Sequence, residues 1–200
     1  MPNQFENIES NEPQAFRLDK DNFEKHFPQG TIQEIDESVL SKDTNHYLYV
    51  EIKKYADEGK LASLYLIKHE SGDEIFVALT SGRHPSEKGM HYYEEFELYE
   101  KRGDKTLGNG KVVRAYVEKP SQPFVGWTST EEKFTNQGLA TRRLQTMNAL
   151  ALATWQQPLR SGNFEPGDYT EKAWERLVKQ HEVERIDTKG RQYYQFILES

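Results

Sequence analysis

One short segment of the chain has the residue types and spacing to bind a phosphate group. In residues 135–141, Thr-Asn-Gln-Gly-Leu-Ala-Thr, Gly138 comes just before an apolar pattern with helical spacing. The first backbone N–H groups of a helix have no partner inside the helix, and their partial positive charge attracts anions. Because Gly138 has no Cβ, an anion can approach the backbone closely. The segment indicates an anion site, although a glycine in this position is also typical of a simple tight turn.

The charges near this segment are unevenly distributed. No carboxylate occurs between Glu132 and Glu165, a stretch that we call the acid-free window; its four cations are Lys133, Arg142, Arg143 and Arg160. In a chain of net charge -7, such a window indicates either an approaching anion or a buried segment that excludes charge. At about 100° per residue, Arg142 falls opposite the apolar stripe of the helix and Arg143 at its border. We therefore expect both at the helix rim, within reach of a phosphate.

Hydrophobic periodicity predicts the elements that position the segment. A helical period covers residues 136–155, and a second helix is predicted over residues 170–180. Residues 19–40 predict two short helical pieces around a turn at residues 28–30. Alternating patterns predict strands over residues 47–52, 61–68, 74–80, 92–100, 111–118, 124–130, 182–187 and 192–198, with turns at residues 71–73, 103–104 and 108–110. The sequence thus predicts a mixed α+β (α/β) fold that contains antiparallel hairpins.

The segment and the order of elements resemble one known family. Residues 136–141, Asn-Gln-Gly-Leu-Ala-Thr opening an amphipathic helix, resemble the pyrophosphate loop of GNAT-superfamily N-acetyltransferases, and the elements that follow agree with that family's order. Residues 158–162 and 173–178 are similar to GNAT-like proteins often encoded by phages and mobile elements. The resemblance covers about residues 124–198. It implies a twisted mixed β-sheet with packed helices, here behind an acidic N-terminal extension.

The resemblance also implies a cofactor and its site. Acetyl-CoA would lie between two diverging strands, residues 125–130 and 159–161, with its pyrophosphate on the amides of residues 137–141. The residues expected to bind it are Thr128, Ser129, Thr130, Thr135, Asn136, Gln137, Gly138, Leu139, Ala140, Thr141 and Arg143. Thr135 stands where the family commonly has Arg or Gln, which removes one long polar side chain from the pyrophosphate.

The family's usual acid and base are missing or moved. No carboxylate lies between Lys119 and Thr130, where the family often has its general base, so Glu131 is the candidate base. Glutamates before a helix also simply favour the helix dipole. The family's general acid is usually a tyrosine four residues beyond an alanine, but four residues beyond Ala173 this chain has Leu177. Tyr169 is therefore the candidate acid. Tyr193 and Tyr194 lie in a closing strand, where tyrosines are usually core residues.

The pattern in residues 92–97, where aromatic and acidic residues alternate, leaves two interpretations open. The side chains could line a pocket for a cationic amine, or they could form a solvated strand face.

We therefore expect an acetyl-CoA-dependent N-acetyltransferase that acts on an amine of a small molecule or a protein. One alternative is a GNAT-fold protein that has lost catalysis and senses acyl-CoA or binds a partner. Another is an acidic decoy that acts through residues 1–60, which hold 13 acidic and 7 basic side chains. The expected organisation is a flexible tail over residues 1–18 and one GNAT-like domain over residues 19–200, with its acetyl-CoA-binding half at residues 124–200.

Composition argues against several other classes. The chain has no cysteine, and its two nearest histidines, His84 and His91, lack neighbouring ligands, so no metal site is expected. Its negative charge disfavours nucleic-acid binding. A mean hydropathy of -0.91 and a polar start without signal-peptide features predict a cytoplasmic protein that does not associate with membranes.

Overall fold

A computed structural model of the protein describes residues 17–40, 46–86, 89–116, 121–162, 169–188 and 191–198. Most of the predicted tail, residues 1–16, lies outside this described part. Among the described residues, no helix is both long enough and apolar enough to cross a membrane.

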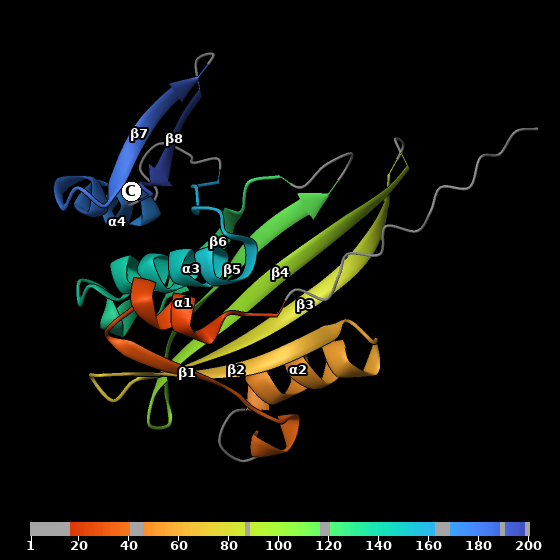
Figure 1. Ribbon diagram of the computed structural model, residues 1–200. Helices are drawn as coiled ribbons and strands as arrows, with labels where there is room; N and C mark the ends of the chain where they lie inside the picture. Colours follow the sequence, from red (N-terminus) through yellow and green to blue (C-terminus); the bar gives the residue numbers. More distant parts are fainter. Residues whose placement is uncertain are drawn as a thin grey trace, which may run out of the picture.

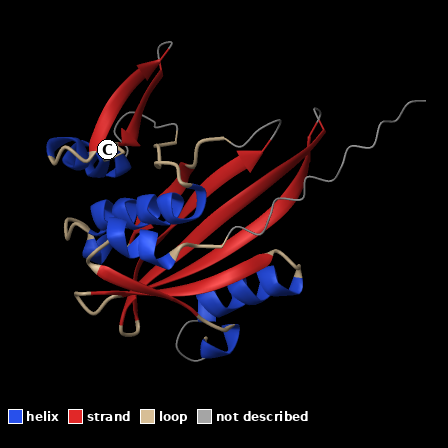
Figure 2. Ribbon diagram, viewed as in Figure 1, coloured by secondary structure: helices blue, strands red, loops and turns tan. Residues whose placement is uncertain are grey.

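Six antiparallel strands form the main sheet, each paired with the next along the chain. The strands are β1 (Gly30–Glu34), β2 (Leu61–His69), β3 (Glu74–Ser86), β4 (Gly89–Arg102), β5 (Lys105–Tyr116) and β6 (Phe124–Thr130). A separate hairpin follows, formed by β7 (Val183–Thr188) and β8 (Arg191–Phe196). Figure 1 shows the long strands crossing the molecule, and Figure 2 shows the helices on either side of them. The prediction of a mixed α+β fold with antiparallel hairpins is confirmed.

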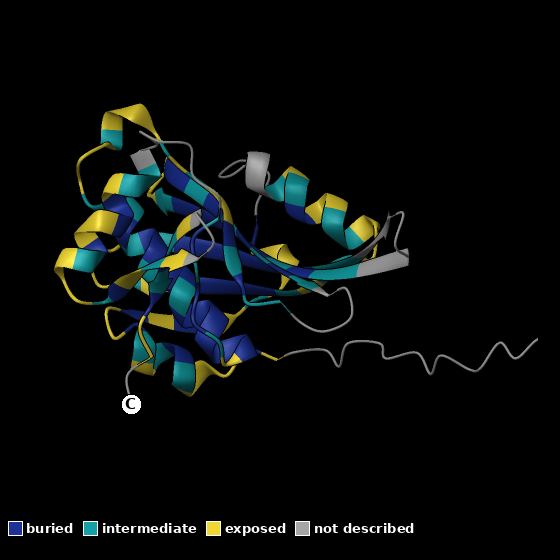
Figure 3. Cartoon of the chain, turned by 90° about the horizontal axis from the view of Figure 1, so that it is seen from above, coloured by how far each residue is buried: buried dark blue, intermediate teal, exposed yellow. Residues whose placement is uncertain are grey.

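Helices cover both faces of this sheet and divide the core in two. The helices are α1 (Lys20–His26), α2 (His46–Asp57), α3 (Leu139–Trp155) and α4 (Tyr169–Lys179), with 3-10 turns η1 (Glu37–Val39) and η2 (Glu132–Phe134). α1, α3 and α4 contribute to one apolar cluster, and Ile52 of α2 belongs to another. Neighbouring residues of β2 face alternate clusters: Leu64 and Leu66 pack towards α2, whereas Tyr65 and Ile67 pack towards α3. Figure 3 shows the resulting buried sheet between partly exposed helices.

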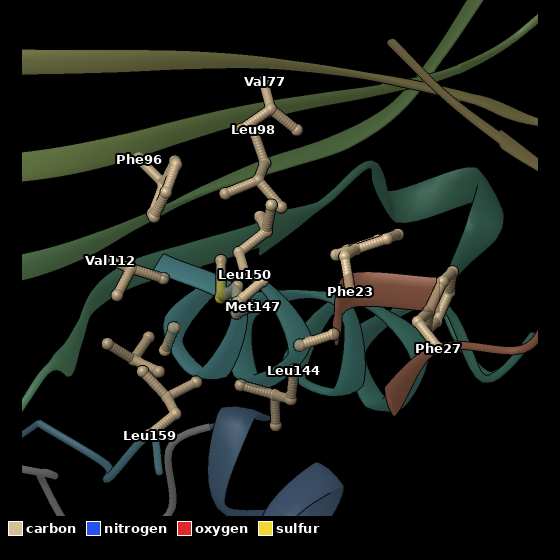
Figure 4. Close-up of a cluster of buried hydrophobic side chains, with 14 of the residues drawn as sticks. Phe23, Phe27, Val77, Phe96, Leu98, Val112, Leu144, Met147, Leu150 and Leu159 are labelled. Atoms are coloured by element: carbon tan, nitrogen blue, oxygen red, sulfur yellow. The ribbon is translucent and has the colours of Figure 1, made fainter. Parts of the chain in front are cut away.

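α3 is the central helix of the larger cluster. Leu144, Met147 and Leu150 are fully buried, and Figure 4 shows Met147 and Leu150 on the side of α3 that faces the strands, whereas Leu144 extends away from them. The helix starts after Gly138 and ends before Gln156. Both of these flanking residues are in the left-handed conformation, and Pro158 follows soon after the end of the helix. The periodic pattern had placed this helix correctly except for its first three residues.

The strand predicted over residues 47–52 is wrong, because these residues belong to α2. The apparent alternation placed Val50 and Ile52 on one face. In the helix Ile52 is buried and Val50 is exposed, since residues two positions apart point about 200° apart. Tyr49, three residues before Ile52, packs on the same cluster as Ile52, which is the helical spacing.

The turn predicted at residues 108–110 is also wrong, because these residues continue β5. Here the two glycines serve the packing of α3. A Cβ at Gly108 would overlap the Arg143 guanidinium, and one at Gly110 would overlap the Met147 methyl group. Their missing side chains let α3 approach the sheet closely.

Two further sequence predictions are corrected. The second helical piece expected in residues 19–40 is strand β1 followed by the 3-10 turn η1. The solvated face considered for residues 92–97 does not form, because Glu94, Phe96 and Glu97 are buried.

A pair of alanine substitutions tests the helical assignment of α2. Val50→Ala should stabilise the protein by about 0.5 kcal/mol, because alanine has the higher helix propensity at an exposed helical position. Thr31→Ala, at an exposed position of strand β1, should destabilise it, because β-branched residues favour strands. Urea denaturation measures both; a loss of stability in Val50→Ala like that in Thr31→Ala would contradict the helix.

Candidate functional site

The outer edge of β6 is paired with described residues only at the start of the strand. At its start, Phe124 pairs in parallel with Arg160, and Val125 N donates to Arg160 O over 3.0 Å. Arg160 also pairs with Gln195 of β8, so residues 159–161 join the six-stranded sheet to the β7–β8 hairpin. From Gly126 onward, the described part of the chain offers the outer edge of β6 no backbone pairing. This unpaired length, residues 126–130, is the β6 edge discussed below.

A bulge marks the point where the pairing stops. Lys111 pairs with Trp127 and Val112 pairs with Val125, which leaves Gly126 as an extra residue in β6. Such a bulge bends its strand and increases the local twist. Gly126, Trp127 and Ser129 are exposed, so the β6 edge is open to solvent next to the bulge.

The β6 edge leads directly into the start of α3. After η2 the backbone passes through left-handed conformations at Asn136 (φ 66°) and Gly138 (φ 79°), and no side chain caps the helix. The first bond of the helix runs from Arg142 N to Gly138 O, so the amides before Arg142 have no partner within the helix. Leu139 and Thr141 are buried, which fixes the direction of these amides. The free N–H groups of such a helix start can bind an anion.

Buried charges hold α3 against the sheet just below this segment. Arg143 is 1% exposed, and its Nη2 donates to Glu100 Oε2 of β4 over 2.7 Å. Its Nη1 donates to the hydroxyls of Thr128 (3.0 Å) and Thr130 (3.1 Å) on β6. One side chain of α3 therefore contacts both β4 and β6, which positions the helix start relative to the β6 edge.

Arg142 extends the same network along the sheet. Its guanidinium pairs with Glu100 and, over 2.8 Å, with Asp73 at the start of β3. Asp73 also accepts a bidentate pair of bonds from Arg102, of 2.6 and 3.0 Å. We call Asp73, Glu100, Arg102, Arg142 and Arg143 the arginine network. It contains three cations and two anions, which leaves one positive charge next to the start of α3.

These contacts correct the expected positions of the two arginines. Arg143 is buried rather than at the rim of α3, and Arg142 is engaged by two carboxylates. The anions that they meet are Asp73 and Glu100 of this chain. Asp73 and Glu100 were missed because they lie far from the acid-free window in sequence. Arg160 packs instead on the rings of Phe124 and Tyr193.

The other expected cofactor residues fall into two groups. Gly138, Leu139, Ala140 and Thr141 come together at the start of α3, and Thr135, Asn136 and Gln137 are exposed in the turn before it. Thr128 and Thr130 lie on the strand edge, but their hydroxyls accept from Arg143. Only the backbone groups of Thr128 and Thr130 therefore remain for a ligand. Ser129, between them, is exposed.

The structure does not bring Glu131, the candidate base, to the bulge. Glu131 is exposed and follows β6, five residues and roughly 17 Å of extended strand from Gly126. Tyr169 is the first residue of α4, and its side chain lies outside the described residues. Leu177 is fully buried in the core. Burial raises the pKa of Tyr194, whose ring stacks on Trp174.

Metal ligands do not gather in the described part of the chain, where no group of three or more His, Asp or Glu residues could hold an ion. The sequence matches no protein-family model and no curated protein.

Removing the shared carboxylate should be costly. Glu100→Gln would leave the buried Arg143 without a countercharge, which typically destabilises a fold by about 3–5 kcal/mol. Glu132→Gln, at an exposed position, is the control and should change stability by less than about 0.5 kcal/mol. The free energies of unfolding in urea measure both, and similar values for the two variants would show that the network does not hold α3.

The network should also make stability depend on acid pH. Burial opposes ionisation of Asp73, but hydrogen bonds from Arg102 and Arg142 outweigh it and lower the pKa to about 2 from 3.8. Because the pKa of Asp73 is lower in the folded state than in the unfolded state, its ionised form stabilises the fold at pH values above the unfolded-state pKa. This stability is lost as the pH falls through the folded-state pKa of about 2. The difference in stability between the wild type and Asp73→Asn should therefore shrink by about 2 kcal/mol between pH 6 and the lowest pH that allows folding. A constant difference over this range would contradict the assigned ion pairs.

Proposed function

We propose that this protein binds acetyl-CoA and transfers its acetyl group to an amine, as a member of the GNAT-like N-acetyltransferases that its sequence resembles. The observation that carries the proposal is the continuity between the β6 edge and the uncapped start of α3. A pantetheine arm carries amides that can pair with an open strand edge. A pyrophosphate needs convergent N–H donors, and the start of α3 offers them.

The order of the elements supports the same proposal. Residues 159–161 lie between β6 and β8, with Ser161 N donating to Tyr194 O (2.7 Å) and Phe196 N donating to Leu159 O (3.0 Å). α3 connects β6 to this segment, and α4 connects the segment to the closing hairpin. This is the order that the resemblance implies, and the parallel contact at Phe124 agrees with it.

The proposed reaction consists of one exchange at the thioester carbon. The lone pair of a neutral amine nitrogen attacks that carbon and forms the C–N bond. The C–S bond then breaks, and its electron pair goes to sulfur. The nitrogen loses one proton and the CoA thiolate gains one, so the products are an N-acetylated amine and free CoA.

The chain's own contribution to this reaction is mainly to bind and orient. β6 carries no carboxylate, and Glu131 lies at the wrong end of the strand to reach an amine at Gly126. Water therefore takes the proton of the amine in this proposal. Because general acid and base groups typically contribute a factor of 10²–10⁴ each, we expect a slow enzyme.

A second candidate function rests on the same observations. The missing carboxylate on β6 and the buried Leu177 at the position of the family's acid favour a protein that binds acyl-CoA without turning it over. Binding of acetyl-CoA is common to both functions, and the release of free CoA distinguishes them.

Acetyl-CoA should raise the melting temperature of the protein, because a ligand that binds only the folded state stabilises it by mass action. At 100 times its Kd the gain is about 2.7 kcal/mol. Differential scanning calorimetry with and without acetyl-CoA measures it. The absence of both a shift and a binding heat at millimolar acetyl-CoA would remove the proposed cofactor.

Gly138→Val should abolish acetyl-CoA binding, because a branched side chain would occupy the space before the amides. Valine is also strained at a φ of 79°, so a matched control is needed. Gly59→Val introduces the same side chain at φ 66°, likewise in open space, at the far end of α2. Both variants should lose stability, but only Gly138→Val should lose binding by isothermal titration calorimetry. Equal affinity in the two variants would show that Gly138 serves only the turn.

A further inference from the structure

A cavity of about 480 Å³ lies on the α2 face of the sheet, opposite α3. Its floor comes from three adjacent strands, with Thr80 on β3, Glu95 on β4 and Val113 on β5 in register with one another. Tyr55 of α2 and Lys60 after it contribute to the walls. We call this space the α2-face cavity. It is not part of the acetyl-CoA site described above.

The carboxylates around the cavity differ in how far they are satisfied. Lys111 Nζ lies 2.6 Å from Glu97 Oε1 and 3.0 Å from Glu95 Oε2. Glu97 also accepts from the Tyr99 hydroxyl over 2.9 Å, and its hydrogen bond with Tyr55 helps burial to raise the pKa of that phenol. Glu95, by contrast, forms one ion pair in the described part of the chain, through its Oε2 with Lys111, and its charge also acts on Lys60 and Tyr55 without a hydrogen bond. Its Oε1 is therefore left as an acceptor in the wall of the cavity.

The lysines of the cavity are neutralised by the chain itself. Burial opposes the charge of Lys111, but its bonds to Glu97 and Glu95 raise the pKa of its ammonium. Lys60 pairs with Glu58 over 2.6 Å. Lys60 and Lys111 line the cavity together with Glu95. Because Glu58 and Glu97 balance the two lysines from outside the cavity, the carboxylate of Glu95 remains as the excess charge of this group. With the tyrosine rings in its walls, the cavity favours an organic cation over an anion.

Two side chains of the cavity wall lie next to the bulge of β6. A Cβ built on Gly126 would lie 3.2 Å from Val113 Cγ2 and 3.5 Å from Lys111 Cγ, and both side chains line the cavity. Glu95 lies two strands from β6, which is about 10 Å at the usual strand spacing. A ligand held by Glu95 can therefore extend along the sheet towards the β6 edge.

We propose that the α2-face cavity binds an aliphatic diamine, with one ammonium on Glu95 and the other nitrogen at Gly126 as the acetyl acceptor. The acceptor role rests on the proposed function, whereas binding of the diamine does not. The nitrogen at Gly126 gives up its ammonium proton to water before it attacks the thioester. The nitrogen on Glu95 keeps its charge and is not acetylated, so the product is a mono-acetylated diamine together with free CoA.

Titration of the full-length protein with 1,5-diaminopentane by isothermal calorimetry tests the binding. Glu95→Gln should weaken the affinity by about tenfold or more, because an uncharged amide replaces the ionic acceptor. Lys111 keeps Glu97 as its partner in this variant. Glu184→Gln, at an exposed position of β7, is the matched control and should bind the diamine like the wild type. Glutarate, of similar length and opposite charge, should not bind.

The outcomes separate this inference from the proposed function. No binding of the diamine, equal binding by Glu95→Gln, or tighter binding of glutarate would overturn the diamine site, even where acetyl-CoA binds. If Glu95→Gln weakens diamine binding but acetyl-CoA does not bind, the diamine site is supported and the acceptor role is overturned. With both ligands present, mass spectrometry should detect mono-acetylated diamine; a di-acetylated product at equal yield would contradict retention of one ammonium on Glu95.

Discussion

The buried pair of Arg143 and Glu100 is the interaction on which the arrangement of the site depends. Arg143 is the residue of α3 that contacts β4 through Glu100 and β6 through the hydroxyls of Thr128 and Thr130. A guanidinium that is 1% exposed is stable only if its donors are matched in geometry. This requirement fixes α3 along its axis and about it, and it explains why Gly108 must lack a side chain. The place where the helix begins, and hence where its free amides point, follows from that fixed position.

The sheet separates two chemical environments that meet at Gly126. On the α3 face, apolar side chains and the arginine network pack between the helix and the strands. On the α2 face, the strands carry tyrosines, glutamates and a lysine around a cavity. The bulge at Gly126 lies at the border, with the open β6 edge on one side and the cavity walls of Val113 and Lys111 on the other. The acetyl transfer that we propose would use this border, because its cofactor and its acceptor would approach one carbon atom from different directions.

The sequence predicted well those elements whose pattern is local. β6 has the predicted bounds, and α3 ends where predicted, since both are defined by their own periodicity. α2 was missed because a few alternating apolar residues fit the period of a strand as well as that of a helix. Only the contact of Ile52 with β2 and β3 shows which side of the segment is buried. Gly108 and Gly110 were misread as a turn because the helix that needs their missing side chains lies more than 30 residues away. The partners of Arg142 and Arg143 likewise come from distant strands, so local charge could indicate an anion but not that the chain supplies it.

Arg142 and Arg143 were expected to bind an anion with their side chains, but both pair with carboxylates of this chain. Asp73 and Glu100 are their partners, so the pyrophosphate binding that we propose would depend mainly on backbone amides. Amides carry partial charges, and their strength comes from convergence in a fixed geometry. That geometry is held by the buried side chains of Leu139 and Thr141 and by the left-handed turns at Asn136 and Gly138. In the proposed function the arginine network would therefore act on a phosphate indirectly, because it anchors the helix whose first turn carries the free N–H groups.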